Sequence, residues 1–148
     1  MNKNIKRNLP LIGIGLIFVL LIMLFIASRA GGNAVRDRII SEKDAAAYLS
    51  GYGWELSEQP SSVKNVEIPA EFTALYESYN QLQKSQGFDL SEYRSKTAIM
   101  YTFRVLNHTS PDDVFANLLV INGNVIAGDV ISYALDGFIT GLDGELLL

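Results

Sequence analysis

The pattern of apolar and polar positions divides the chain into one long apolar run and a longer part in which the two classes alternate. Residues 8–28, NLPLIGIGLIFVLLIMLFIAS, contain no charged side chain. A helix of this length spans about 30 Å, which matches the hydrocarbon core of a bilayer. The pattern therefore predicts a transmembrane helix over residues 9–28, in contact with the lipid bilayer, after a short basic tail at residues 1–8.

A cleaved secretory signal is the alternative interpretation of this run. The apolar core of such a signal is usually about 7–15 residues long, and this run is longer. Residues 28–30, Ser-Arg-Ala, would nevertheless fit a cleavage site. The length favours an uncleaved anchor.

Basic residues lie on both sides of the run, so their distribution alone does not fix the orientation. A short basic tail before a first span usually stays in the cytoplasm, which predicts a cytoplasmic N-terminus and a C-terminal domain outside the cell membrane. Residues 29–40 contain Gly31, Gly32 and Asn33 and are predicted to form a flexible tether. Residues 41–148 are enough for one domain with a modest core.

The first part of this domain is predicted to contain a helix and a short strand. Ser41 precedes Glu-Lys-Asp, which resembles a capping box in which the Ser41 hydroxyl accepts from the amide of Asp44. The alanines that follow favour a helix, and Gly51 ends it. The alternation of residues 54–57, Trp-Glu-Leu-Ser, is typical of a strand.

A second helix is predicted over residues 71–86. Phe72, Leu75, Tyr79 and Leu82 form one apolar stripe, and Gly87 follows as a left-handed cap. We expect the stripe to pack on the sheet of the same domain, with the docking of a partner helix as the alternative.

Three strands are predicted in the second half, over residues 97–106, 114–121 and 125–131. Asn122-Gly123 is a strong signal for a two-residue hairpin, because a type I′ turn needs positive φ at both positions. Gly128 indicates a bulge or a close backbone approach. Residues 133–148 contain two Asp-Gly turn signals and no clear element.

The order α-β-α-β-β-β predicts an α+β fold, with an antiparallel sheet of three to four strands and two helices on one face. From Ser41 onward the chain contains 6 basic and 15 acidic side chains, a net charge of −9. Such a domain is repelled by nucleic acid, which we do not expect as a partner. A cation, a basic protein or a neutral ligand is compatible with this charge, which also serves solubility.

Cysteine is absent, so the chain has no disulfide, thiol nucleophile or lipidated cysteine. Histidine occurs once, at His108, beside Ser110 and Asp112 in a predicted turn, and no GxSxG motif accompanies it. Carboxylates such as Asp136 are frequent in the last third, but no compact DxDxDG run indicates calcium. No catalytic, metal-binding or cofactor-binding residue is therefore assigned.

Four residues are candidates for a functional surface. Asp129 lies within a predicted strand, where acidic residues are rare, so a buried Asp129 would need a partner such as Arg104. Trp54 and Tyr52 belong to an aromatic cluster that can be a ligand platform or the edge of the core. Asp136 is the fourth candidate.

Several strings in the domain resemble domain of unknown function 4830, a bacterial family of membrane-anchored proteins. The resemblance implies a single N-terminal span and an extracytoplasmic domain, and it carries no activity. The strings are Gly51-Tyr-Gly-Trp-Glu55, Ile68-Pro-Ala-Glu-Phe72, Tyr79-Asn-Gln-Leu-Gln83, Gln86-Gly-Phe-Asp-Leu90 with Tyr93, Tyr101-Thr-Phe-Arg-Val105, Ala116-Asn-Leu-Leu-Val120, Gly123-Asn-Val-Ile-Ala-Gly-Asp129 and Leu135-Asp-Gly-Phe138.

These observations predict a non-enzymatic, membrane-anchored module whose acidic domain binds or senses another envelope or membrane protein, or another envelope component. One alternative is a small envelope hydrolase that uses carboxylates such as Asp112 or Asp129. Another is an accessory subunit whose span packs against a larger membrane protein.

Overall fold

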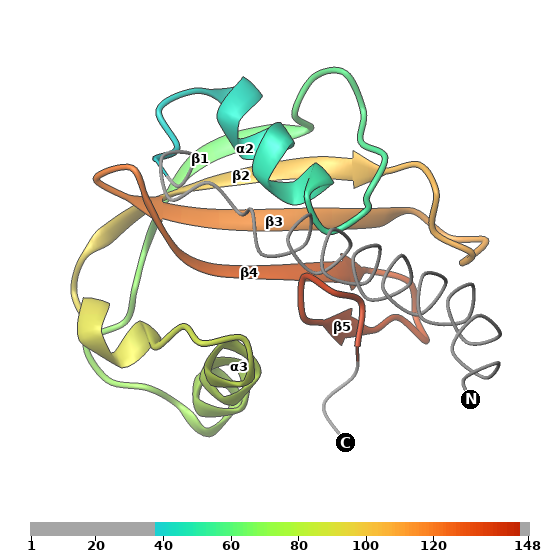
Figure 1. Ribbon diagram of the computed structural model, residues 1–148. Coiled ribbons are helices and arrows are strands. Elements are labelled where there is room, and N and C mark those ends of the chain that lie inside the picture. Colours follow the sequence, from blue (N-terminus) through green and yellow to red (C-terminus); the bar gives the residue numbers. More distant parts are fainter. Residues whose placement is uncertain (1–37, 146–148) are drawn as a thin grey trace, which may run out of the picture. The chain divides into compact units, whose positions relative to one another are not determined.

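Five antiparallel strands follow one another across a single sheet in the computed structural model, which describes residues 38–145 (Figure 1). The sheet order is β1-β2-β3-β4-β5, so each strand pairs with its neighbour in sequence. Helix α2 precedes β1, and helix α3 and the 3₁₀ helix η1 lie between β1 and β2. The bounds are α2 Glu42–Ser50, β1 Ser62–Glu67, α3 Ala74–Ser85, η1 Leu90–Tyr93, β2 Thr97–Val105, β3 Val114–Ile121, β4 Asn124–Ser132 and β5 Ile139–Thr140.

The predicted α+β class and the antiparallel sheet are confirmed, and β5 adds a short strand in the region left without an element. The predicted transmembrane helix at residues 9–28 lies outside the described residues. Within residues 38–145, no helix is both long enough and apolar enough to cross a bilayer.

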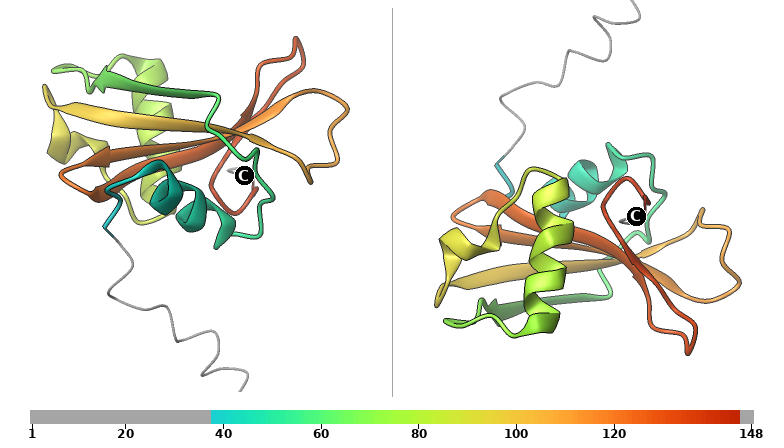
Figure 2. Two further views of the ribbon diagram at one scale, coloured as in Figure 1. Left: turned by 90° about the horizontal axis from the view of Figure 1, so that it is seen from above. Right: turned by 90° about the horizontal axis from the view of Figure 1, so that it is seen from below.

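The two helices cover opposite faces of the sheet, so the prediction that both lie on one face is wrong (Figure 2). Leu49 of α2 belongs to a core with Phe103 and Leu118. On the α3 side a second core contains Leu119 and Ile126. The apolar run of β3 is buried on both faces, a pattern typical of a central strand between two layers.

The first strand is not where the alternation of residues 54–57 placed it. Leu56 forms only an isolated bridge with Val105, whereas Ser62–Glu67 forms six pairs with β2. This strand lies at the edge of the sheet and carries Lys64 and Glu67, and charged side chains are common on edge strands because they discourage further pairing. Only its end, at residues 66–68, was expected to be extended, because residues 62–65 are polar apart from Val63 and give no clear strand pattern.

The hairpin between β3 and β4 forms as predicted. Asn122 and Gly123 have φ values of 52° and 82°, as a type I′ turn requires. Leu119 pairs with Ala127 and Val120 with Val125, which leaves Ile126 as the extra residue of a bulge.

Gly128 lies at a close approach, the second of the two alternatives predicted for it. A Cβ at Gly128 would lie 2.7 Å from Cδ1 of Leu142, so the Leu142 side chain occupies the space above the glycine.

The chain enters the described domain beside this hairpin. Arg38 forms a bridge with Asn124, and the amide of Ile39 donates to the carbonyl of Gly123 at 2.8 Å. The predicted cap of α2 is present, because the amide of Asp44 donates to the Ser41 hydroxyl at 3.2 Å. Hydrogen bonds from Ser41 and from the Ile40 amide lower the pKa of Asp44.

Candidate functional site

Helix α3 turns a partly polar face toward the domain. Asn80 and Gln83 are fully buried although both carry amides. The Asn80 side chain accepts from the amide of Leu90 at 2.8 Å and donates to Asp89 at 3.1 Å. Burial of the Asn80 amide is tolerated because it pairs with groups that would otherwise lack partners, whereas Nε2 of Gln83 is buried without a hydrogen-bond partner.

Two glutamines of this segment bind the edge of β4. The amide of Gly128 donates to Oε1 of Gln83 at 2.9 Å, and Nε2 of Gln86 donates to the carbonyl of Gly128 at 3.0 Å. Oε1 of Gln86 also accepts from the amide of Leu142 at 2.7 Å. The helix is therefore fixed beside β4 by side-chain hydrogen bonds to the backbone.

A row of polar side chains crosses three strands beneath α3. Thr102 of β2, Asn117 of β3 and Asp129 of β4 are paired in register. The Thr102 hydroxyl donates to Asn117 at 2.7 Å, and Nδ2 of Asn117 donates to Asp129 at 2.8 Å. Tyr79 of α3 closes the row, because its hydroxyl donates to the other oxygen of Asp129 at 2.8 Å.

Asp129 is 4% exposed, and neutral groups supply both of its hydrogen bonds. Burial raises the pKa of Asp129, and the hydrogen bonds from Asn117 and Tyr79 oppose this rise. Burial together with the neighbouring carboxylate also raises the pKa of Tyr79 well above its ordinary value. The predicted partner Arg104 instead forms an exposed ion pair with Asp113.

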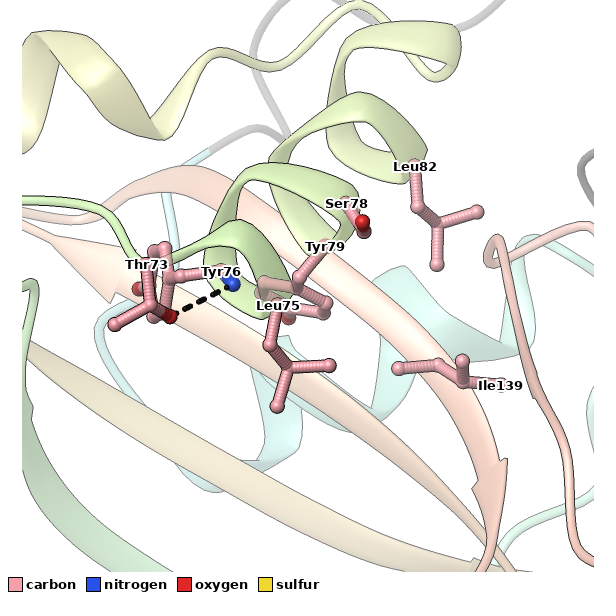
Figure 3. A pocket seen from close by; sticks show the side chains of 7 residues that line it. All are labelled: Thr73, Leu75, Tyr76, Ser78, Tyr79, Leu82 and Ile139. Atoms are coloured by element: carbon pink, nitrogen blue, oxygen red, sulfur yellow. Dashed lines mark hydrogen bonds between the residues drawn. The ribbon is translucent and has the colours of Figure 1, made fainter.

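An apolar groove of about 510 Å³ runs beside α3 (Figure 3). Most of its wall belongs to α3, and Ile139 of β5 stands across from the helix. Leu75 is 82% exposed and Ile139 is 39% exposed, so apolar side chains stand at the open side. The lining residues are Thr73, Leu75, Tyr76, Ser78, Tyr79, Leu82 and Ile139.

Hydroxyl groups in the groove are mostly engaged within the protein. The Thr73 hydroxyl accepts from the amide of Tyr76 at 3.2 Å and caps α3. The Ser78 hydroxyl donates to the carbonyl of Ala74 at 3.1 Å, and that of Tyr79 donates to Asp129. No charged side chain belongs to the described lining. The groove therefore offers apolar surface rather than groups for acid–base or nucleophilic chemistry.

Trp54, a candidate from the sequence, lies at the other face with the α2 core. Its indole N–H donates to the carbonyl of Leu142 at 2.6 Å, and its ring centroid lies 6.0 Å from that of His108. His108 stacks on Phe138 at 5.1 Å and accepts from the amide of Ser110 at 3.0 Å. These rings pack against one another as part of the domain edge.

The four candidate residues do not form one site. Tyr52 contacts the ring of Tyr48 at 5.9 Å beside the end of α2, and Asp136 is exposed in the turn between β4 and β5. Only Asp129 adjoins the groove, through Tyr79. Across residues 38–145, no group of three or more histidine and carboxylate side chains is placed to hold a metal ion.

Three of the four residues of the apolar stripe pack on the same domain as expected, since Phe72 and Tyr79 contact the α3-side core and Leu82 is buried. The groove was missed because the fourth residue, Leu75, faces solvent. The one signal for this surface was the helix-docking alternative for the stripe. Nothing in the sequence indicated that Ile139 stands opposite the helix.

The fold and the groove define this part of the chain as a small α+β domain with an apolar groove beside α3. The family model for domain of unknown function 4830 (DUF4830) matches residues 48–130, more than half of the chain. The chain therefore belongs to this family. No curated protein and no solved structure matches it.

Proposed function

We propose that the protein is a single-pass membrane-anchored module that binds or senses another envelope or membrane protein, or another envelope component, through its acidic domain. The N-terminus would be cytoplasmic and residues 41–148 would lie outside. The uncharged run at residues 8–28 supports the anchor. The apolar groove beside α3 is the observation that carries the binding role.

Leu75 is a large apolar side chain that the groove leaves exposed to water. Its side chain is 82% exposed next to Tyr76, Ser78 and Tyr79, and Ile139 faces the same space. Concave apolar surfaces of 300–1,000 Å³ are typical of ligand sites in proteins. A ligand that covers this apolar surface removes it from water, and this burial stabilises the complex.

Site-specific photocrosslinking in cells tests the binding role. A photoreactive amino acid at Ser78 is expected to form a discrete adduct, whereas the same residue at Leu106, exposed at the end of β2, is not. Leu75→Ser is expected to remove the adduct, and the matched change Leu106→Ser is expected to leave it. Both leucines are exposed, so each change should alter stability by less than about 0.5 kcal/mol. Equal labelling from both positions would contradict the proposal.

Membrane placement needs its own measurement. We expect the full chain to remain with membranes after alkaline carbonate extraction, because a span of 20 uncharged, mostly apolar residues is not released by charge or pH. A protease added to intact spheroplasts is expected to degrade residues 41–148. Release of the chain into the soluble fraction would contradict the anchor, and protection from protease would contradict the orientation.

The geometry supports binding better than hydrolysis. Both oxygens of Asp129 are engaged by Tyr79 and Asn117, and a general acid or nucleophile must reach its substrate. Asp112 is exposed in the loop before β3 and is not among the residues that line the groove beside Tyr79. An accessory-subunit role would depend on the span, which lies outside the described residues.

A further inference from the structure

The groove has the length of a short helical segment. Thr73 and Leu82 are nine residues apart on the helical wall, which corresponds to about 14 Å along the axis. A partner helix that lies along this wall would contact it over about two and a half turns.

Hydrogen bonding favours a ligand whose backbone is already paired. The hydroxyls of Thr73, Ser78 and Tyr79 are engaged, and the α3 backbone is paired within the helix. An extended peptide would bury N–H and C=O groups against this wall without partners, which costs free energy. The neighbouring strand β5 has two residues and could pair only a very short segment. A helix satisfies its own backbone and avoids this cost.

Spacing along α3 also matches helix packing. Leu75, Ser78, Tyr79 and Leu82 occupy positions i, i+3, i+4 and i+7, the pattern of a helix face that contacts a neighbouring helix. Ser78 is small and lies between larger side chains, which leaves a hole for a partner side chain. The open side leaves the outer half of a bound helix in water, so that half must be polar.

The net charge of the domain indicates which charged side chains the outer half of the bound helix should carry. Residues 38–145 contain 7 basic and 15 acidic side chains, a net charge of −8, while the described groove lining is uncharged. A helix with basic side chains on its outer face is attracted to such a domain, and an acidic one is repelled.

We propose that the groove receives one amphipathic α-helix of a partner protein, with its apolar face on Leu75 and Ile139 and a basic outer face. The proposal rests on the binding function proposed above and names the class of partner.

A fluorescence-anisotropy titration tests the partner class. The full chain in neutral phosphatidylcholine nanodiscs is titrated into a dye-labelled 14-residue peptide with leucine at i, i+3, i+4, i+7, i+8 and i+11 and lysine elsewhere. Empty nanodiscs give the background. A peptide of the same composition without an apolar face and a peptide with glutamate in place of lysine are the probe controls.

The leucine–lysine helix is expected to bind, and both control peptides are expected to bind at least tenfold more weakly. Leu75→Ser is expected to weaken binding of the helix by about tenfold or more, as truncation of a central apolar contact usually does. Leu106→Ser is expected to leave the Kd unchanged. Photocrosslinks from the bound peptide are expected in residues 73–82 and at Ile139.

Equal binding of the rearranged peptide, or a Kd insensitive to Leu75→Ser, would overturn the helix assignment. The same holds if the peptide binds only after residues 146–148 are deleted, because those leucines would then be the occupant. An in-cell adduct from Ser78 that contains a lipid or an extended peptide would overturn the helix and leave the binding function standing. Failure of both the peptide and the in-cell adduct would overturn both proposals.

Discussion

Asp129→Ala is expected to lower the free energy of unfolding by about 2 kcal/mol at pH 7, because it leaves Asn117 and Tyr79 with buried donors that lack an acceptor. Removal of the buried charge offsets part of this loss. Asp129→Asn keeps the shape and an acceptor for Asn117, and its amide can donate to the Tyr79 oxygen. We therefore expect Asp129→Asn to be at least as stable as the wild type at pH 7.

The pH dependence separates the charge of Asp129 from its shape. The pKa of Asp129 is raised in the folded domain above an unfolded value of about 3.9. The folded state then binds the proton more tightly, so stability falls as pH rises from about 3.9 through the raised folded pKa. Asp129→Asn lacks this dependence, and its advantage over the wild type is expected to grow with pH across that window.

Urea denaturation of the full chain in micelles, followed by the fluorescence of the single tryptophan, Trp54, measures these differences. The difference between the wild type and Asp129→Asn removes the contribution of the other carboxylates. A constant difference from pH 4 to pH 8 would contradict a raised pKa of Asp129. A destabilised Asp129→Asn at pH 7 would show that the charge itself stabilises the polar row.

Gly128→Ala is expected to destabilise the domain by about 1–3 kcal/mol, since a core position without free space tolerates added atoms poorly. The new Cβ would lie 2.7, 2.8 and 2.9 Å from Cδ1, Cδ2 and Cγ of Leu142. Leu142 would have to shift, and its carbonyl accepts the indole N–H of Trp54. The fluorescence of Trp54 is therefore expected to change together with the stability.

A double-mutant cycle identifies Leu142 as the cause. Leu142→Ala alone is expected to cost about 2–4 kcal/mol through the cavity that it leaves. The double variant Gly128→Ala with Leu142→Ala is expected to cost less than the sum of the two single changes, because the methyl group added at residue 128 enters the cavity that Leu142→Ala leaves. Strict additivity would contradict the close approach of Leu142 to Gly128.

The sequence predicted elements whose signal is local. Asn122-Gly123 requires a left-handed backbone at both positions, and β3 is apolar at every position but Asn117, so both were placed correctly. The cap at Ser41 depends on side chains three residues apart and was also predicted.

Features that depend on partners distant in sequence were not predicted. The inward face of α3 contains Asn80 and Gln83, whose amides serve the backbone of Leu90 and Gly128. A hydrophobicity pattern counts such residues as solvent-facing, so the predicted stripe covered only the apolar part of the buried face of α3. The sheet face beneath α3 was not expected to be buried, because the polar residues Thr102 and Asn117 lie on it and polar residues are usually exposed.

The candidate site was predicted in part. Asp129 was recognised as a residue that needs a partner if buried, and it has two, but neither is Arg104. Arg104 lies on the same face, two residues along β2 from Thr102, and stays exposed with Asp113. Neutral donors serve the buried carboxylate, and the long guanidinium keeps its contact with water, which avoids the desolvation cost of a buried ion pair.

The fastening of Ile39 to the β3–β4 turn has a mechanical consequence. A pull on the N-terminal segment loads the bridge from Arg38 to Asn124, the hydrogen bond from Ile39 to Gly123 and the buried Ile39 side chain before it reaches α2. Detachment of residues 38–40 would add about 10 Å of extended chain while the capped helix α2 stays in place. Under the proposed membrane anchor, these contacts at one hairpin would set how far the domain reaches from the bilayer.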